Sequence, residues 1–71
     1  MSNYNDFLKV VAGLSSGTVF EITADWCAAH GLHVDSNIVK SWGHYFADDY
    51  SKYNCVYNGT GTDNHRSYKK L

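Results

Sequence analysis

Several residue types and patterns are scarce or missing in this chain of 71 residues, and each absence excludes something. No apolar run approaches the ~18 residues that a membrane-spanning helix needs, so we expect no membrane protein. The N-terminal residues lack the basic start, long apolar centre and small-residue cleavage site of a signal peptide. Two cysteines in a chain without an export signal are expected to stay reduced, and the predicted location is cytoplasmic, in a bacterial or phage-infected cell. Proline is absent, which leaves glycine and asparagine as the turn signals.

The length of the chain limits it to one domain, residues 1–71, with a small core. Three Phe, two Trp and six Tyr are the residues most able to stabilise such a core, because each buries a large area. Five tyrosines are too many for the interior of so small a domain. They either cover the core beneath the C-terminal segment or form a protein interface. The five tyrosines are Tyr45, Tyr50, Tyr53, Tyr57 and Tyr68.

The net charge of −1 excludes a strong basic field over the whole molecule. Its distribution is uneven. Residues 1–51 carry two lysines against six acidic residues, a net −4, whereas residues 52–71 carry four basic residues against one aspartate, a net +3. A molecule polarised in this way suits contact of its C-terminal segment with phosphate, or docking on a protein of mixed charge.

Hydrophobic spacing and capping residues predict three helices. Apolar residues at helical spacing indicate a first helix over residues 4–14, capped by Asn3 or Asn5. After a short extended segment at 18–22, Thr23 caps a second helix of about two turns, and Gly31 ends it in the left-handed conformation. A third helix is predicted over residues 36–48, with Asp35 or Ser36 as its cap.

The third predicted helix has two different faces. One is an apolar stripe that should face the core, formed by Ile38, Val39, Trp42, Tyr45 and Phe46. The other consists of side chains that can form hydrogen bonds, namely Asn37, Lys40, Ser41, His44 and Asp48. This polar face is either a recognition surface or an ordinary solvated helix face.

A β-hairpin is predicted over residues 53–70. Tyr53, Cys55 and Tyr57 alternate on one face of its first strand, and alternate positions of residues 65–70 place Arg66, Tyr68 and Lys70 on one face of the second. Asn58-Gly59 is a strong turn signal, and residues 60–64 extend the loop. With three helices and a hairpin, the predicted fold class is α+β.

This order of elements resembles a winged helix-turn-helix domain of the small phage or bacterial type. The resemblance covers nearly the whole chain and is carried at residues 26–32, WCAAHGL, where a small residue stands four positions before the turn glycine. It implies that helix 36–48 enters the major groove of double-stranded DNA and that the 53–70 wing contacts the backbone. Carried over to this chain, it implies base contacts by Asn37, Lys40, Ser41 and His44, and phosphate contacts by His65, Arg66, Lys69 and Lys70. The corresponding function is a small DNA-binding regulator, expected to act as a homodimer.

An alternative function uses the same fold to bind a protein. Small phage inhibitors of host defences, anti-CRISPR proteins among them, resemble this chain in size, acidity and aromatic content. The helix 36–48 has no arginine, the residue that most specific DNA readers use to bind guanine. In this hypothesis the acidic residues Asp25, Asp35, Asp48 and Asp49 engage a basic surface on a host effector. A purely structural interaction module is a third interpretation.

Other chemistry is not favoured by the sequence. Cys27, His30 and His33 are spaced as C-x2-H-x2-H, but this spacing does not match a common zinc finger, and a structural zinc site needs four convergent ligands. A Cys–His nucleophile would need a pocket and an oxyanion site, for which 71 residues leave little room. We therefore predict no metal, no cofactor and no enzyme activity.

Overall fold

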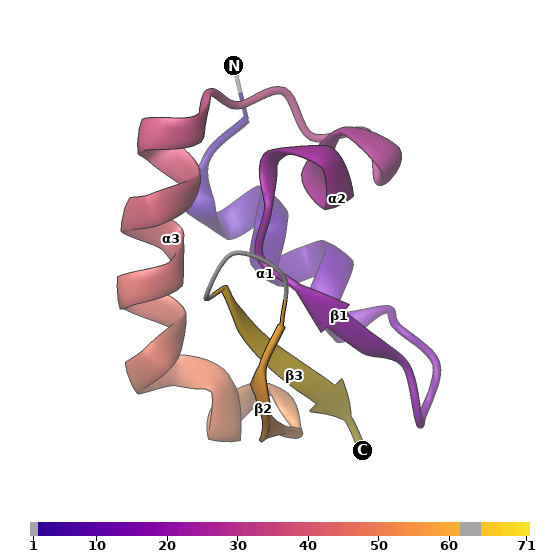
Figure 1. The fold of residues 1–71 in the computed structure, drawn as a ribbon. Helices are drawn as coiled ribbons and strands as arrows, with labels where there is room; N and C mark the ends of the chain where they lie inside the picture. The colour runs from indigo at the N-terminus through magenta and orange to yellow at the C-terminus, as the bar shows by residue number, and fades with distance from the viewer. Residues whose placement is uncertain (1, 62–64) are drawn as a thin grey trace.

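A computed structural model describes residues 2–61 and 65–71 and shows a mixed α+β fold with three helices and a three-stranded antiparallel sheet (Figure 1). In chain order the elements are α1 (Tyr4–Ala12), β1 (Val19–Glu21), α2 (Ala24–Ala29), α3 (Ser36–Asp49), the 3-10 turn η1 (Tyr50–Tyr53), β2 (Cys55–Thr60) and β3 (Arg66–Lys70). The fold class predicted from the sequence is confirmed at this level. Within the described residues, no helix has both the length and the apolar character to cross a bilayer.

Helix α1 begins at a capping box. The Asn3 side chain accepts a hydrogen bond from the Asp6 amide, and the Asp6 carboxylate accepts one from the Asn3 amide. Phe7, Leu8 and Val11 form its buried face. The helix ends at Ala12, two residues before the predicted end, because Gly13 favours a break in the helix.

Helix α2 and the turn after it follow the prediction closely. The Thr23 hydroxyl accepts a hydrogen bond from the Trp26 amide at 3.1 Å and caps the helix. Gly31 has φ +77°, and the amides of Gly31 and Leu32 donate to the carbonyls of Ala28 and Cys27. This pair of bonds is a Schellman motif, which folds Leu32 back into the core, where it is 6 % exposed.

Helix α3 starts where predicted and runs one residue further than predicted. The Asp35 carboxylate accepts a hydrogen bond from the Ile38 amide, so Asp35 is the N-cap. Val39, Trp42 and Phe46 are buried as the apolar stripe predicted. Tyr45 is an exception, because it is 53 % exposed and packs edge-on against the ring of Tyr4 at the molecular surface.

The sheet has the strand order β1-β3-β2. The segment predicted as extended therefore forms a strand, and β1 pairs with β3 rather than standing alone. Phe20, Tyr68 and Tyr57 lie opposite one another in the three strands and form an aromatic row on the face that packs on α3. The ring of Phe46 meets Tyr68 edge-on, with 4.9 Å between the centroids. This contact fixes the sheet against α3.

The hairpin differs from the prediction at both ends of its first strand. Tyr53 belongs to η1 rather than to the strand, and Asn54, at φ +59°, makes the left-handed step that starts β2. The predicted turn at Asn58-Gly59 is wrong, because both residues lie inside β2, which continues to Thr60. Gly59 has φ +91°, and the pairing register shifts between Tyr57 and Thr60. The strong turn dipeptide is therefore used as a bulge. The predicted loop residues 62–64 lie outside the described residues.

Aromatic rings from four elements meet in the core. Phe7 of α1 contacts Trp26 of α2 and both Trp42 and Phe46 of α3, at centroid distances of 5.4 to 6.0 Å. Phe20 of β1 stacks on Trp26 at 5.2 Å. Tyrosines were predicted to exceed the capacity of the core, and among them Tyr68 is fully buried whereas Tyr45 and Tyr57 are about half exposed.

Candidate functional site

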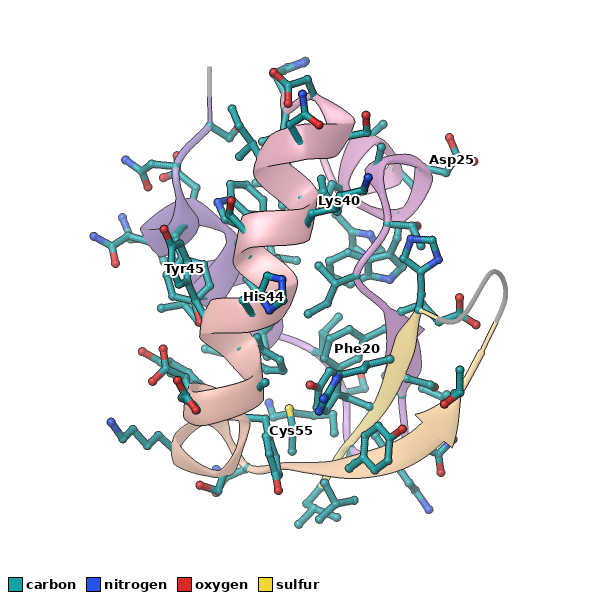
Figure 2. The ribbon with its side chains drawn as sticks, turned by 60° about the vertical axis from the view of Figure 1, so that its left-hand side comes forward. Phe20, Asp25, Lys40, His44, Tyr45 and Cys55 are labelled. Carbon is teal, nitrogen blue, oxygen red and sulfur yellow. The ribbon has the colours of Figure 1, made fainter. Side chains whose placement is uncertain are left out.

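The polar face of α3 is exposed along its length. Asn37, Lys40, Ser41 and His44 all lie at the surface, as the helical spacing predicted. The Ser41 hydroxyl donates to the Asn37 carbonyl at 3.4 Å, a weak bond that leaves the outer side of the helix accessible. Figure 2 shows Lys40 and Tyr45 projecting from different sides of α3, with His44 between them. One edge of this exposed face borders a groove.

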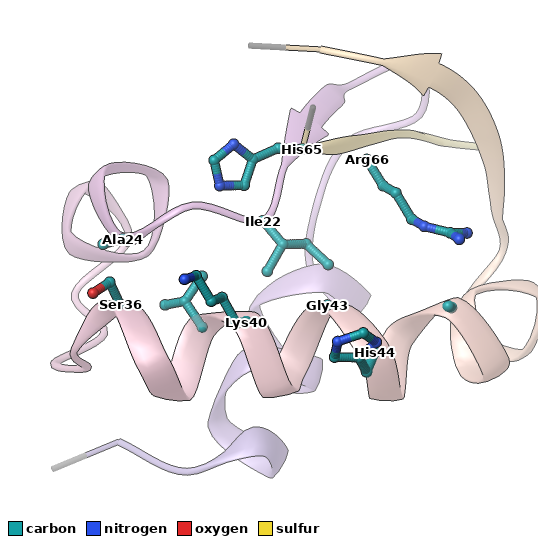
Figure 3. Close-up of a pocket in the computed structure, with 10 residues that line it drawn as sticks. Ile22, Ala24, Ser36, Lys40, Gly43, His44, His65 and Arg66 are labelled. Atoms are coloured by element: carbon teal, nitrogen blue, oxygen red, sulfur yellow. The ribbon is translucent and has the colours of Figure 1, made fainter. Parts of the chain in front are cut away.

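The groove lies between α3, the segment that joins β1 to α2, and the start of β3 (Figure 3). It has a volume of about 310 Å³. Half of the lining residues are apolar or glycine: Ile22, Ala24, Val39, Gly43 and Ala47. The polar residues of the lining are Ser36, Lys40, His44, His65 and Arg66. Among the residues that the structure describes, no aspartate or glutamate lines the groove.

Four of the eight predicted site residues meet at this groove. Lys40 and His44 come from α3, whereas His65 and Arg66 come from the start of the second hairpin strand, more than twenty residues later in the sequence. In Figure 3, His65 lies across from Lys40 at one end of the groove, and Arg66 lies across from His44 at the other. Two permanent cations lie on opposite walls, and the described part of the lining holds no carboxylate, an arrangement that favours an anion.

Arg66 is positioned by the aromatic row of the sheet. Its guanidinium carbon lies 5.7 Å from the ring centroid of Tyr57, within range of a cation–π contact. The hydroxyl of Tyr68 is buried next to it and has no hydrogen-bond partner among the described residues. Burial raises the pKa of the Tyr68 hydroxyl, and the nearby Arg66 charge opposes that rise. The phenol is therefore a neutral neighbour that brings no opposite charge to Arg66.

Lys70 does not fit its predicted role as a phosphate contact. The residue is 7 % exposed, and its Nζ donates to the carbonyls of Val11, Ala12 and Leu14 at 3.3, 3.1 and 3.2 Å. These carbonyls lie at and just after the C-terminal end of α1, where a cation is stabilised by the helix dipole. Lys70 therefore closes a helix end inside the molecule and is removed from the set of surface cations.

Lys69 is exposed but faces away from the groove. It lies opposite Val19 and Val56 in the sheet, and successive residues of a strand point to opposite faces. Because Tyr68 points to α3, Lys69 lies on the outer face of the sheet beside the exposed Val19 and Val56. Of the four predicted phosphate contacts, only His65 and Arg66 share a surface with α3.

The groove also contains residues that the sequence analysis did not select, chiefly Ile22 and Gly43. Ile22 belongs to a segment recognised only as extended, and its partner in the wall, Val39, was assigned only to the core. The sequence does contain an indication at Gly43. Glycine in the middle of a helix is unfavourable and indicates a packing or binding requirement. A Cβ built at Gly43 meets no atom within 4 Å, so packing within the chain does not require glycine there.

Cys27 and His30, two residues of the C-x2-H-x2-H pattern, are held in structural contacts. The Cys27 thiol is fully buried, and burial raises its pKa to about 11, which keeps it protonated. The His30 ring packs against Trp26, and its Nδ1 lies 2.8 Å from the Trp26 carbonyl oxygen. Within residues 2–61 and 65–71, no three side chains of His, Cys, Asp or Glu converge as metal ligands would.

The acidic residues of the alternative hypothesis are divided between structural contacts and the surface. Asp35 caps α3, and the Asp49 carboxylate accepts a hydrogen bond from the Tyr4 hydroxyl at 2.9 Å and pairs with Lys52 at 3.7 Å. Asp25 and Asp48 are exposed.

Comparison of the chain with protein-family models, with curated proteins and with solved structures found no match.

Proposed function

We propose that this chain is a small nucleic-acid-binding regulator that reads double-stranded DNA with α3 and contacts the backbone with the hairpin. The observation that carries the proposal is the groove that brings Lys40 and His44 of α3 together with His65 and Arg66 of the hairpin. The described lining of this groove includes no carboxylate. The element order and the pairing of β1 with β3 are compatible with a winged helix-turn-helix domain. In this arrangement the exposed Asn37 and Ser41 face base edges, which amide and hydroxyl groups can read.

The expected affinity for DNA is modest and depends on salt. Lys40 and Arg66 supply two permanent charges beside the groove, and Lys69 supplies a third on another face. Each phosphate neutralised contributes a slope of about −0.9 to the plot of log affinity against log salt concentration. A slope of roughly −2 to −3 is therefore expected, much shallower than that of a strongly basic repressor.

Fluorescence anisotropy with labelled duplexes at low salt tests the proposal. The duplexes are of random and of source-genome sequence. Lys40→Gln and Arg66→Gln should each weaken binding and reduce the salt slope by about 1, and the double variant should reduce it by about 2. Lys9→Gln is the matched control, because Lys9 is an exposed lysine on α1 away from the groove. Binding that is absent at low salt, or that falls equally with Lys9→Gln, contradicts the proposal.

A dimer would let two copies of α3 read a two-fold site, with half-sites about one helical turn apart. We propose the exposed face of α1, which presents Asn5, Lys9 and Ala12 at the surface, as the contact between the two copies. Sedimentation equilibrium with and without a duplex measures the oligomeric state of the chain directly.

Inhibition of a host effector is the second candidate, and the exposure of Tyr45 favours it. A tyrosine that is 53 % exposed on a helix, one turn from the exposed Asp48, is suited to a protein interface. This candidate predicts recovery of one stoichiometric partner from host lysate, lost with Tyr45→Ala and retained with Lys40→Gln. Retention of the partner by Tyr45→Ala would count against the assignment of this surface.

A further inference from the structure

We propose that the groove between α3 and β3 binds a small organic anion that has an apolar, aromatic-sized body and one phosphate or carboxylate group. The site uses Lys40, His44, His65 and Arg66, which the proposed function also uses, but ligand binding does not require that the chain bind DNA. Three features of the groove support this inference: its apolar wall, the glycine in that wall, and the placement of its cations.

The apolar wall is suited to a small hydrophobic body. Ile22 and Val39 are each 4 % exposed, so they form a fixed surface, and the side chains of Ala24 and Ala47 are short. The volume of about 310 Å³ is at the lower end of the range for small-molecule sites, about 300–1,000 Å³. Such sites are typically apolar with a few polar groups at their edge, as in this groove.

Gly43 keeps the wall open at a cost to the helix. It lies in the middle of the 14-residue helix α3 and lines the groove beside Ile22 (Figure 3). Because a Cβ at this position would meet no atom, alanine would fit the fold and would favour the helix. A larger side chain would instead occupy the groove. The open groove, and not packing against other parts of the chain, therefore accounts for glycine at this position.

The cations determine the class of ligand. Lys40 and Arg66 lie towards opposite ends of the groove, and none of the described residues that line it is acidic. An apolar body alone would leave both charges unpaired, whereas an inorganic anion alone would leave the apolar wall without a partner. A ligand that has both parts satisfies both surfaces. When bound, its anionic group contacts a cation of the groove and its body fills the space beside it, so the ligand competes with DNA for this face.

A matched set of three probes tests this chemistry on the full chain by amide chemical shifts. The probes are 1-naphthyl phosphate, the neutral 1-naphthol and inorganic phosphate. We expect saturable binding of 1-naphthyl phosphate, with shifts centred on Ile22, Val39, Gly43 and Arg66, at least about tenfold tighter than either partial probe. An absence of saturable shifts, shifts centred elsewhere, or equal affinity for 1-naphthol overturns the inference.

Two variant pairs locate the site. Gly43→Leu should fill the groove and weaken 1-naphthyl phosphate binding at least about tenfold while α3 stays folded. Its control is Ala28→Leu, which adds a leucine at an exposed position of α2. Lys40→Gln should weaken binding of 1-naphthyl phosphate and not that of 1-naphthol, with Lys9→Gln as control. If Gly43→Leu does not fold, the comparison of Lys40→Gln with Lys9→Gln still tests the site. Equal losses in a variant and its control refute the site.

The two proposals fail separately. A chain that binds 1-naphthyl phosphate in the groove but gives no anisotropy change with DNA supports the ligand site and refutes the nucleic-acid function. A chain that binds DNA but shows no saturable shifts with 1-naphthyl phosphate refutes the ligand site alone. If both bind, addition of 1-naphthyl phosphate should release labelled DNA, and retention of the DNA at saturating probe refutes the competition.

Discussion

The ammonium group of Lys70 lies 3.1 Å from the carbonyl oxygen of Ala12, so the end of the last strand closes the end of the first helix. The same Nζ reaches the carbonyls of Val11 and Leu14. The three donors of one ammonium thus bind three carbonyls at and just after the end of the helix.

Lys70→Met should destabilise the protein because it keeps most of the aliphatic stem but removes these three bonds. Hydrogen bonds to a charged group contribute about 1.5–3 kcal/mol, and we expect a loss of free energy of unfolding in that range. Urea denaturation followed by circular dichroism measures it. Lys69→Met is the matched control, since Lys69 is exposed on the other face of the same strand, and it should change stability by less than about 0.5 kcal/mol. Equal effects of the two substitutions would contradict the role assigned to Lys70.

Glycine to alanine should have opposite effects at two positions. Gly31→Ala forces a side chain into the left-handed conformation at φ +77°, which costs about 1–2 kcal/mol. Gly43→Ala removes a flexible residue from the interior of α3 without a clash, and should stabilise the protein by about 0.5–1 kcal/mol. For a domain of this size, 1 kcal/mol corresponds to a change of about 4–8 °C in Tm. Thermal unfolding of the two variants checks the signs, and a fall in Tm for Gly43→Ala would show that α3 needs glycine for its own packing.

Stability should fall with rising pH between about 9 and 11, in part because of Cys27. Burial raises the pKa of its thiol from 9.0 to about 11 in the folded chain. Within this window the unfolded chain loses the thiol proton and the folded chain keeps it, so unfolding becomes more favourable, by at most about 1.4 kcal/mol per pH unit. Below pH 9 this contribution is fully retained. The raised pKa values of Cys55 and of the tyrosines Tyr4 and Tyr68 act in the same direction, so the measurement is the difference in slope between wild type and Cys27→Ala. Identical slopes would refute the assignment to Cys27.

Both cysteines should react slowly with thiol reagents while the chain is folded. Cys27 is 0 % exposed and Cys55 is 2 % exposed, and burial raises the pKa of each thiol, so little thiolate is available. Ellman's reagent at pH 8 should modify the native protein at a rate set by its opening, and the urea-unfolded protein at once. Rapid native modification of either thiol would show that the core around it opens easily.

The Tyr4 hydroxyl and the Asp49 carboxylate connect the start of the chain to the end of α3. Tyr4→Phe removes this 2.9 Å hydrogen bond and leaves the ring contacts with Phe7 and Tyr45 in place. We expect a loss of about 0.5–1.5 kcal/mol in denaturant unfolding. Ser41→Ala, which removes a weak 3.4 Å bond on the exposed face, is the control and should be close to neutral.

Local signals in the sequence determined the helices. Asn3, Thr23 and Asp35 cap them as predicted, and Gly31 ends α2, because these effects depend on neighbours within about four residues. Helical spacing also identified the exposed face of α3, and with it Lys40 and His44. Strand alternation placed Arg66 on the same face of β3 as Tyr68, which the aromatic row of the sheet bears out.

The tertiary structure alone decided which of these residues meet. Asn58-Gly59 is a turn signal by local preference, but pairing with β3 extends β2 through it and makes it a bulge. Lys70 resembles any surface lysine in the sequence, and only the packing of β3 against α1 places its ammonium beside three carbonyls. The groove likewise requires Ile22, Gly43 and Arg66 to converge from three segments, and convergence depends on long-range packing that no local pattern encodes.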